Sequence, residues 1–119
     1  MSDQKTILLV DDTPENIELL SGILDGHYTL KVALNGQRAL KVVAKSQPDL
    51  ILLDVVMPGM DGYEVCTTLK TDPATSEIPI IFVTGTAPDT EKEQALGAVG
   101  TVTKPIDPAT LRALIADNL

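Results

Sequence analysis

Three short apolar runs, separated by helical patterns, place the strongest constraint on the fold of this chain. The runs lie at residues 6–10 (TILLV), 49–53 (DLILL) and 78–84 (IPIIFVT). Near-continuous apolar runs of this length are typical of strands that helices cover on both faces. Because such runs alternate with helical patterns from end to end, the sequence predicts a parallel α/β sheet.

Two further segments alternate apolar and polar residues, as half-exposed edge strands do. They are residues 28–33 (YTLKVA) and 101–103 (TVT), the second and fifth predicted strands. A right-handed, doubly wound sheet of order 2-1-3-4-5, flanked by five helices, places these two strands at its edges. We therefore expect a flavodoxin-like α/β fold. The length of 119 residues allows a single domain, residues 1–119.

The predicted helices begin at recognisable capping signals. Thr13 and Asp107 each precede a proline, which suits the first helical position, and Asn35 and Asp61 are favourable N-caps. Residues 88–96 (PDTEKEQAL) predict a short, acidic fourth helix. Other residues have unremarkable interpretations: Gly59 and Gly62 as turn residues, Cys66 as core, and Glu91 and Glu93 on a solvated helix face.

Charge and cysteine content exclude several classes of function. Nine basic and 17 acidic residues give a net charge of −8, and such a surface repels nucleic acid and anionic lipid. The lone Cys66 cannot form an intramolecular disulfide. The opening residues MSDQKT lack the apolar core of a signal peptide, and no apolar run is long enough to span a bilayer. We expect a soluble, cytoplasmic protein that binds neither nucleic acid nor membrane through this domain.

Polar residues follow four of the predicted strands. Asp11 and Asp12 follow the first strand, Asp54 the third, and Lys104 the fifth, while Thr84 ends the fourth. In a doubly wound sheet, ligands bind beyond the carboxyl ends of the strands, at the switch point between the first and third. We therefore expect these five side chains to converge on one edge of the sheet.

The chemistry of this group favours phosphoryl transfer. Three neighbouring carboxylates repel one another unless a cation lies among them, and Mg²⁺ prefers a few carboxylates with waters and phosphate oxygens. Lys104 and Thr84 offer a positive charge and a hydrogen bond to a further anion. One carboxylate is then available as nucleophile. Asp54 is the best candidate because it stands alone on the central strand.

These residues resemble the receiver domain of bacterial two-component response regulators, over essentially the whole chain. The resemblance rests on Asp11-Asp12, Asp54 with the MPGMDG stretch, Thr84-Gly85 and Lys104-Pro105, in that order. It implies that a sensor histidine kinase or phosphotransfer protein phosphorylates Asp54, and that the chain is a signalling switch rather than an enzyme. Within this family, the stretches DDTPENIELLSGIL and DGYEVC look most like receivers attached to cyclic-di-GMP phosphodiesterase or histidine kinase modules.

The resemblance also implies residue roles. Asp12, Asp54 and the backbone carbonyl of Val56 would ligate Mg²⁺, with Asp11 helping through water. Thr84 and Lys104 would bind the phosphoryl oxygens, and the Lys104–Pro105 peptide would be cis.

Three positions bear on how the signal is kept and passed on. Thr101 stands where the family usually has an aromatic residue, and the segment between Thr84 and Lys104 is about two residues short, so we expect no aromatic switch. By the same resemblance, Val56 and Thr86 occupy the positions that in this family help to orient the attacking water. Since neither side chain is strongly polar, we expect slow dephosphorylation.

Two other functions remain open on the sequence alone. An aspartyl-phosphate phosphatase also uses Mg²⁺ and an aspartate nucleophile, but it normally carries a second aspartate two residues later, where this chain has Val56. A flavodoxin-type nucleotide module would need a glycine-rich or hydroxyl-rich loop after the first strand, where Asp11 and Asp12 would repel a phosphate.

Overall fold

The computed structural model describes residues 4–85 and 89–119, which form five parallel strands and five helices in strict alternation. In chain order the elements are β1 (Thr6–Val10), α1 (Pro14–Leu24), β2 (Thr29–Ala33), α2 (Gly36–Lys45), β3 (Leu50–Asp54), α3 (Gly62–Thr71), β4 (Ile80–Thr84), α4 (Thr90–Ala95), β5 (Gly100–Thr103) and α5 (Pro108–Asp117).

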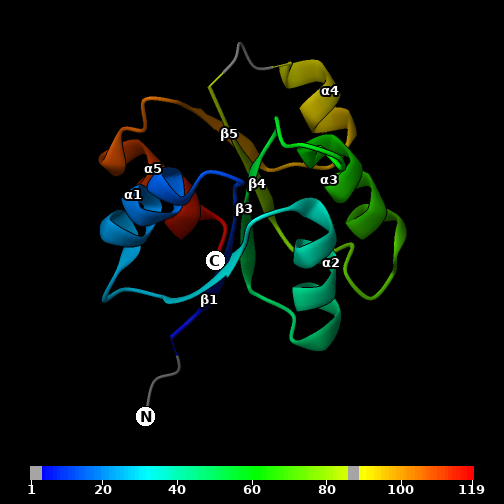
Figure 1. Ribbon diagram of the computed structural model, residues 1–119, viewed down its shortest axis with the longest axis horizontal. Coiled ribbons are helices and arrows are strands. Elements are labelled where there is room, and N and C mark those ends of the chain that lie inside the picture. The colour runs from blue at the N-terminus through cyan, green and yellow to red at the C-terminus, as the bar shows by residue number, and fades with distance from the viewer. Residues whose placement is uncertain (1–3, 86–88) are drawn as a thin grey trace.

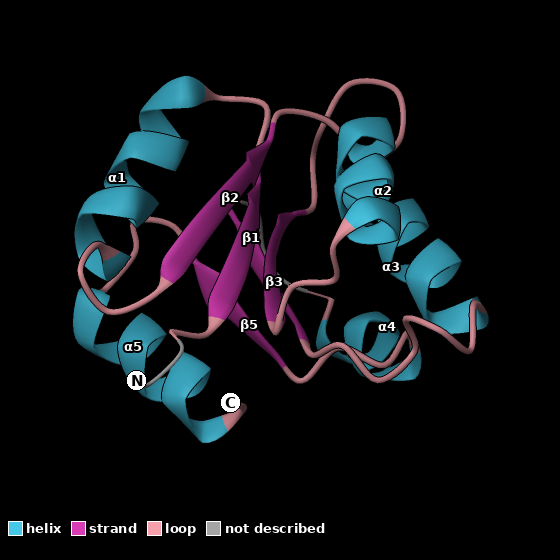
Figure 2. Ribbon diagram, turned by 90° about the horizontal axis from the view of Figure 1, so that it is seen from below, coloured by secondary structure: helices cyan, strands magenta, loops and turns pink. Residues whose placement is uncertain are grey.

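The strands form one sheet of order β2-β1-β3-β4-β5, so the predicted doubly wound topology is confirmed. Helices α1 and α5 cover one face of the sheet, and α2, α3 and α4 cover the other (Figures 1 and 2). The chain order reverses between β1 and β3, which places the switch point at their carboxyl ends.

The sequences of the central strands are almost entirely apolar because helices bury both faces of the sheet. Every residue of β3 and β4 is buried, and two separate clusters fill the space on either side of the sheet. Phe82, the one phenylalanine of the chain, lies with Cys66 in the cluster beneath α2, α3 and α4. Cys66 is fully buried, which confirms its assignment to the core.

The edge strands also behave as predicted. In β2, only Ala33 is buried, and in β5 only Val102 is buried. These two strands each have one neighbour in the sheet, which explains their alternating sequences.

Helix starts follow the sequence signals, with differences in detail. Asn35 and Asp61 cap α2 and α3 through their side chains, and Asp61 forms a reciprocal capping box with Glu64. Thr13 and Asp107 precede α1 and α5 without a side-chain capping bond, and a proline follows each of them at the start of the helix. Helix α4 is six residues long and begins after Asp89. In the described parts of the chain, none of the helices has the length and apolarity that a bilayer crossing requires.

Candidate functional site

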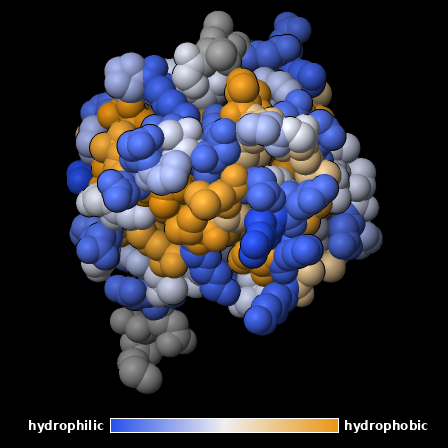
Figure 3. Space-filling view, in the orientation of Figure 1, coloured by the Kyte–Doolittle hydropathy of each residue, from blue (hydrophilic) through white to orange (hydrophobic). Residues whose placement is uncertain are grey.

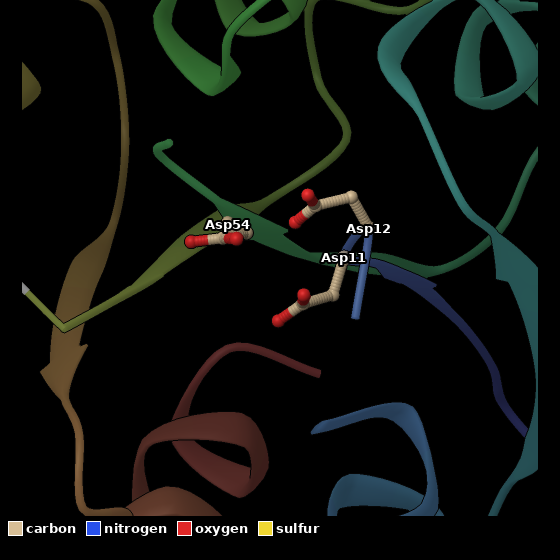
Figure 4. Close-up of side chains that lie close together, drawn as sticks. All are labelled: Asp11, Asp12 and Asp54. Carbon is tan, nitrogen blue, oxygen red and sulfur yellow. The ribbon is translucent and has the colours of Figure 1, made fainter. Parts of the chain in front are cut away.

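The strand register brings the predicted site residues to one edge of the sheet. Val10 pairs with Leu53, so the next residues, Asp11 and Asp54, lie side by side at the ends of β1 and β3. Figure 4 shows Asp11 and Asp12 extending from the end of β1 toward Asp54. One carboxylate oxygen from each of the three lies within 4.8 Å of the others. The predicted acidic cluster therefore forms.

Lys104 reaches this cluster from the far end of the chain. Its Nζ lies 3.2 Å from Oδ2 of Asp11 and 3.7 Å from Oδ1 of Asp54. The backbone helps to aim it, because the Lys104 N–H donates to the carbonyl oxygen of Thr84 at 2.8 Å. The Lys104–Pro105 peptide is cis, as predicted. Thr84 itself is buried at the end of β4.

The electrostatics of the cluster single out Asp54. Its side chain is buried, and this burial, together with the negative charges of Asp11 and Asp12, raises its pKa from 3.8 to about 6. The ammonium of Lys104 and the backbone N–H of Val56 act in the opposite direction but do not cancel the effect. A positive ion among the three carboxylates would relieve this repulsion, and the all-oxygen donor set suits a hard divalent cation.

The start of α1 holds Asp11 in place. Its Oδ1 accepts hydrogen bonds from the Thr13 N–H at 2.9 Å and from Nδ2 of Asn16 at 3.4 Å, while Oδ2 meets Lys104. Sequence reasoning did not single out Asn16. Its position in the first turn of a helix that follows two aspartates is the signal that could have found it.

Gly62 fixes the position of Asp54 from the other side. A Cβ at Gly62 would lie 2.1 Å from the carbonyl oxygen of Asp54, closer than any side chain can approach. The Gly62 N–H donates to the carbonyl oxygen of Val55 at 2.8 Å. The interpretation of Gly62 as a turn residue is therefore wrong: it opens α3 in close contact with the backbone of Asp54. Gly59, with a φ of +76°, is the turn residue.

Helix α4 is held by a buried carboxylate. Oε2 of Glu93 accepts from the hydroxyl of Tyr63 on α3 at 2.8 Å, and Oε1 accepts from the hydroxyl of Thr101 on β5 at 2.5 Å. Burial and this bond to Glu93 raise the pKa of Tyr63 to about 12. Glu93 is 2% exposed, so the predicted solvated face is wrong at this position, although Glu91 is exposed as expected. Thr101, at the position where the family that the sequence resembles usually has an aromatic residue, donates a hydrogen bond to Glu93 of α4.

Val56 and Thr86 are the two residues expected to affect the attacking water. Val56 follows β3 with its side chain 62% exposed beside the site. Thr86 lies outside the described residues.

Comparison with known proteins agrees with this geometry. The family model described as "Response regulator receiver domain" matches residues 7–116. A probable cyclic di-GMP phosphodiesterase of Vibrio cholerae is 44% identical over 98% of this chain and 27% of its own length. Response regulator PleD of Caulobacter vibrioides is 44% identical over 92% of this chain and 25% of its own.

The fold comparison points the same way. A crystal structure of the chemotaxis protein CheY4 of Vibrio cholerae superposes with a TM-score of 0.90, at 29% identity, covering 98% of this chain and 99% of that one. The chain spans about a quarter of the length of the two longer relatives. It belongs to the response regulator receiver domain family, whose members are phosphorylation-controlled switches of two-component signalling.

Proposed function

We propose that Asp54 is the phosphoacceptor of this receiver and that residues 1–119 form one such domain. The observation that carries the proposal is the position of Asp54, buried at the end of the central strand beside the carboxylates of Asp11 and Asp12 and the ammonium of Lys104. A buried carboxylate whose pKa lies near 6 is ionised at neutral pH and poorly solvated, which favours a nucleophilic role.

The proposed reaction transfers a phosphoryl group from a phosphohistidine of a sensor kinase or phosphotransfer protein. A carboxylate oxygen of Asp54 attacks phosphorus, the P–N bond breaks, and its electron pair stays on the imidazole of the donor. The product is an acyl phosphate on Asp54. Lys104 would bind the new phosphoryl oxygens, as would the hydroxyl of Thr84.

Asp11, Asp12, Asp54 and the backbone carbonyl of Val56 form the proposed Mg²⁺ site. Receiver domains generally bind Mg²⁺ at an acidic pocket, and the three clustered carboxylates supply the donor set that this ion prefers. Bound there, the ion would supply positive charge to the transferring phosphoryl group. Asp11, held by Thr13 and Asn16, would act through a water.

The chain would act as a switch without turnover of a separate substrate. An aspartyl-phosphate phosphatase places an acid/base group two residues after its nucleophile, and here that position holds the apolar, exposed Val56. We further propose that the domain works in the cytoplasm, where phosphohistidine donors of two-component systems act. The output it controls would be a protein module, in keeping with the longer relatives.

Intact-mass measurement tests the acceptor directly. With acetyl phosphate and Mg²⁺, the wild-type chain should gain one phosphoryl group that decays slowly, whereas Asp54→Asn should gain none. Asp12→Ala should raise the Mg²⁺ concentration required more than a control substitution outside the cluster, Asp72→Ala. Stoichiometric labelling of Asp54→Asn would refute the assignment, and unchanged Mg²⁺ dependence in Asp12→Ala would refute the ligand set.

A further inference from the structure

The charges of this chain are divided unevenly along its sequence. Residues 26–48 contain four basic residues and no acidic ones, whereas the rest of the chain holds five basic and 17 acidic residues. The four are Lys31 on β2 and Arg38, Lys41 and Lys45 on α2. Within residues 4–85 and 89–119, none of these four side chains makes a hydrogen bond or ion pair. A strongly acidic protein thus keeps a positive surface with which the carboxylates of the described residues form no ion pair.

This positive surface borders a groove between β2 and α2. One hollow of about 410 Å³ is lined by Lys31, Val32, Val42, Lys45 and Ser46. A second hollow, of about 460 Å³, shares Val32 and Val42 with the first and continues toward Leu34 and Arg38. We call these two adjoining hollows together the edge groove, lined principally by Lys31, Val32, Leu34, Arg38, Val42 and Lys45.

The edge groove is lined by both apolar and basic residues. Val32 and Leu34 are 44% and 47% exposed, which is high for large aliphatic side chains. Arg38, Val42 and Lys45 follow the i, i+4, i+7 spacing and therefore share one face of α2. Figure 3 shows an apolar patch near the middle of this side of the molecule, with hydrophilic residues beside it.

The backbone of β2 adds hydrogen-bonding groups to this groove. Among the described residues, β2 pairs with β1 and with no other strand, through groups such as the Thr29 N–H, which donates to Lys5, and the Ala33 carbonyl, which accepts from Asp11. Since backbone groups alternate in direction along a strand, those of Leu30 and Val32 point away from the sheet. An unpaired edge of this kind is a template for one more strand.

We propose that the edge groove binds an extended, acidic segment of a partner protein, which adds to β2 as an outer strand. Strand addition supplies the backbone hydrogen bonds, and alternate side chains supply specificity. Arg38 and Lys45 lie about 10 Å apart along the axis of α2. Acidic side chains two to four residues apart on an extended strand span a similar distance, about 7–13 Å.

The charges favour this occupant over two others. A second copy that paired edge to edge through β2 would bring the two sets of basic residues together. A nucleic acid would meet the acidic residues that dominate the rest of the chain. A short acidic peptide meets neither form of repulsion.

The probe for this proposal is a seven-residue peptide of alternating valine and glutamate, titrated into the ¹⁵N-labelled chain at low ionic strength. We expect amide shifts confined to β2 and α2. Arg38→Glu and Lys45→Glu should each weaken binding about three- to tenfold, because each replaces an attraction by a repulsion. Arg112→Glu, the same reversal at an exposed position of α5, should leave the affinity unchanged within about twofold, and a valine–lysine peptide should not shift the amides of β2 and α2.

Two backbone-methylated peptides distinguish strand addition from simple charge attraction. One peptide carries backbone N-methyl groups on its valines and the other on its glutamates. Because the N–H groups of alternate residues on an extended strand point to the same side, only one of the two peptides loses the N–H donors that face β2. We expect one peptide to lose binding and the other to keep it. Absence of binding, shifts centred elsewhere, equal weakening by Arg112→Glu, or equal behaviour of the two methylated peptides would each overturn the proposal. So would self-association of the free chain through β2.

Discussion

At the scale of single residues, the raised pKa of Asp54 couples the proposed acceptor to the stability of the fold. The folded state prefers the protonated carboxyl because burial and two neighbouring carboxylates disfavour its charge. The unfolded chain has no such preference. The protonated Asp54 therefore contributes its full stabilisation at pH values below the pKa of the unfolded chain. This contribution is lost as the pH rises through the higher pKa of the folded state.

We therefore predict that Asp54→Asn stabilises the Mg²⁺-free protein at neutral pH. The gain should be small near pH 4, increase up to about pH 6, and reach at most about 3 kcal/mol above that. Urea denaturation of both proteins at several pH values measures it. Mg²⁺ should reduce or reverse the difference at pH 7.5, since it would stabilise the wild type preferentially. A difference that is the same at pH 4.5 and pH 7.5 would show that Asp54 is not destabilised by its charge.

Val56 provides a second test at this scale. Because its side chain is 62% exposed beside Asp54, a polar residue fits there without disturbing the core. Val56→Asn should hasten loss of the phosphoryl group by roughly tenfold, since an amide can orient the attacking water. Decay of the labelled protein, followed by intact mass, gives the rate. Val56→Ala separates polarity from size: if it accelerates decay as much as Val56→Asn, bulk rather than hydrogen bonding controls access of water.

At the scale of the elements, α4 depends on one side chain. The helix has six residues, too few to be stable alone, and Glu93 ties it to Tyr63 of α3 and Thr101 of β5. Further contacts strengthen this region. Tyr63 packs edge-on against Phe82, and the ammonium of Lys92 lies 4.5 Å from the centre of the Tyr63 ring. Thr101 thus holds α4 through the hydrogen bond of its hydroxyl, since its side chain is too small to hold the helix by packing.

We predict that Glu93→Ala destabilises the protein by about 1–3 kcal/mol, because the hydroxyls of Tyr63 and Thr101 lose their acceptor. Glu91→Ala is a matched control, since Glu91 lies in the same helical turn but is exposed. It should change the free energy of unfolding by less than about 0.5 kcal/mol. Equal effects of the two substitutions in urea denaturation would mean that the buried bonds of Glu93 contribute nothing.

The contrast between Asp54 and Glu93 explains what the sequence could and could not predict. Asp54 ends a five-residue apolar strand, so its position follows from the strand pattern and from the rule that parallel strands end at a common edge. Glu93 lies among acidic neighbours in a polar segment, and its burial depends on groups from two other elements. Gly62 was misassigned for the same reason: its role depends on how closely α3 approaches the backbone of Asp54.

At the scale of the whole molecule, the short α4 and the hydrogen bonds of Glu93 that hold it bear on which parts of the domain change when Asp54 is phosphorylated. Thr84 ends β4 and, in the proposed mechanism, its hydroxyl would bind the phosphoryl group. The segment after it leads directly into α4. Because Thr101 stands where the family usually has an aromatic residue, we predict that no aromatic side chain from this position turns toward Thr84 on phosphorylation.

Amide hydrogen exchange with and without beryllofluoride, a phosphoryl mimic, shows which elements change on phosphorylation. We predict that changes concentrate in the segment after Thr84 and in α4, while β5 and α5 change little and the chain stays monomeric. Exposed carboxylates such as Glu91 make α4 a poor surface for pairing two copies. Strong new protection across α4, β5 and α5, with dimerisation, would contradict this prediction.

The ion pair between Asp11 and Lys104 joins residues 93 positions apart. One partner directly follows β1, the first strand of the domain, and the other directly follows β5, the last. During translation, the proposed acceptor site therefore stays incomplete until Lys104 has left the ribosome and β5 has added to the sheet. A kinase that requires this ammonium could modify only those chains in which Lys104 has already been synthesised, so competence for phosphorylation would report that synthesis has passed β5.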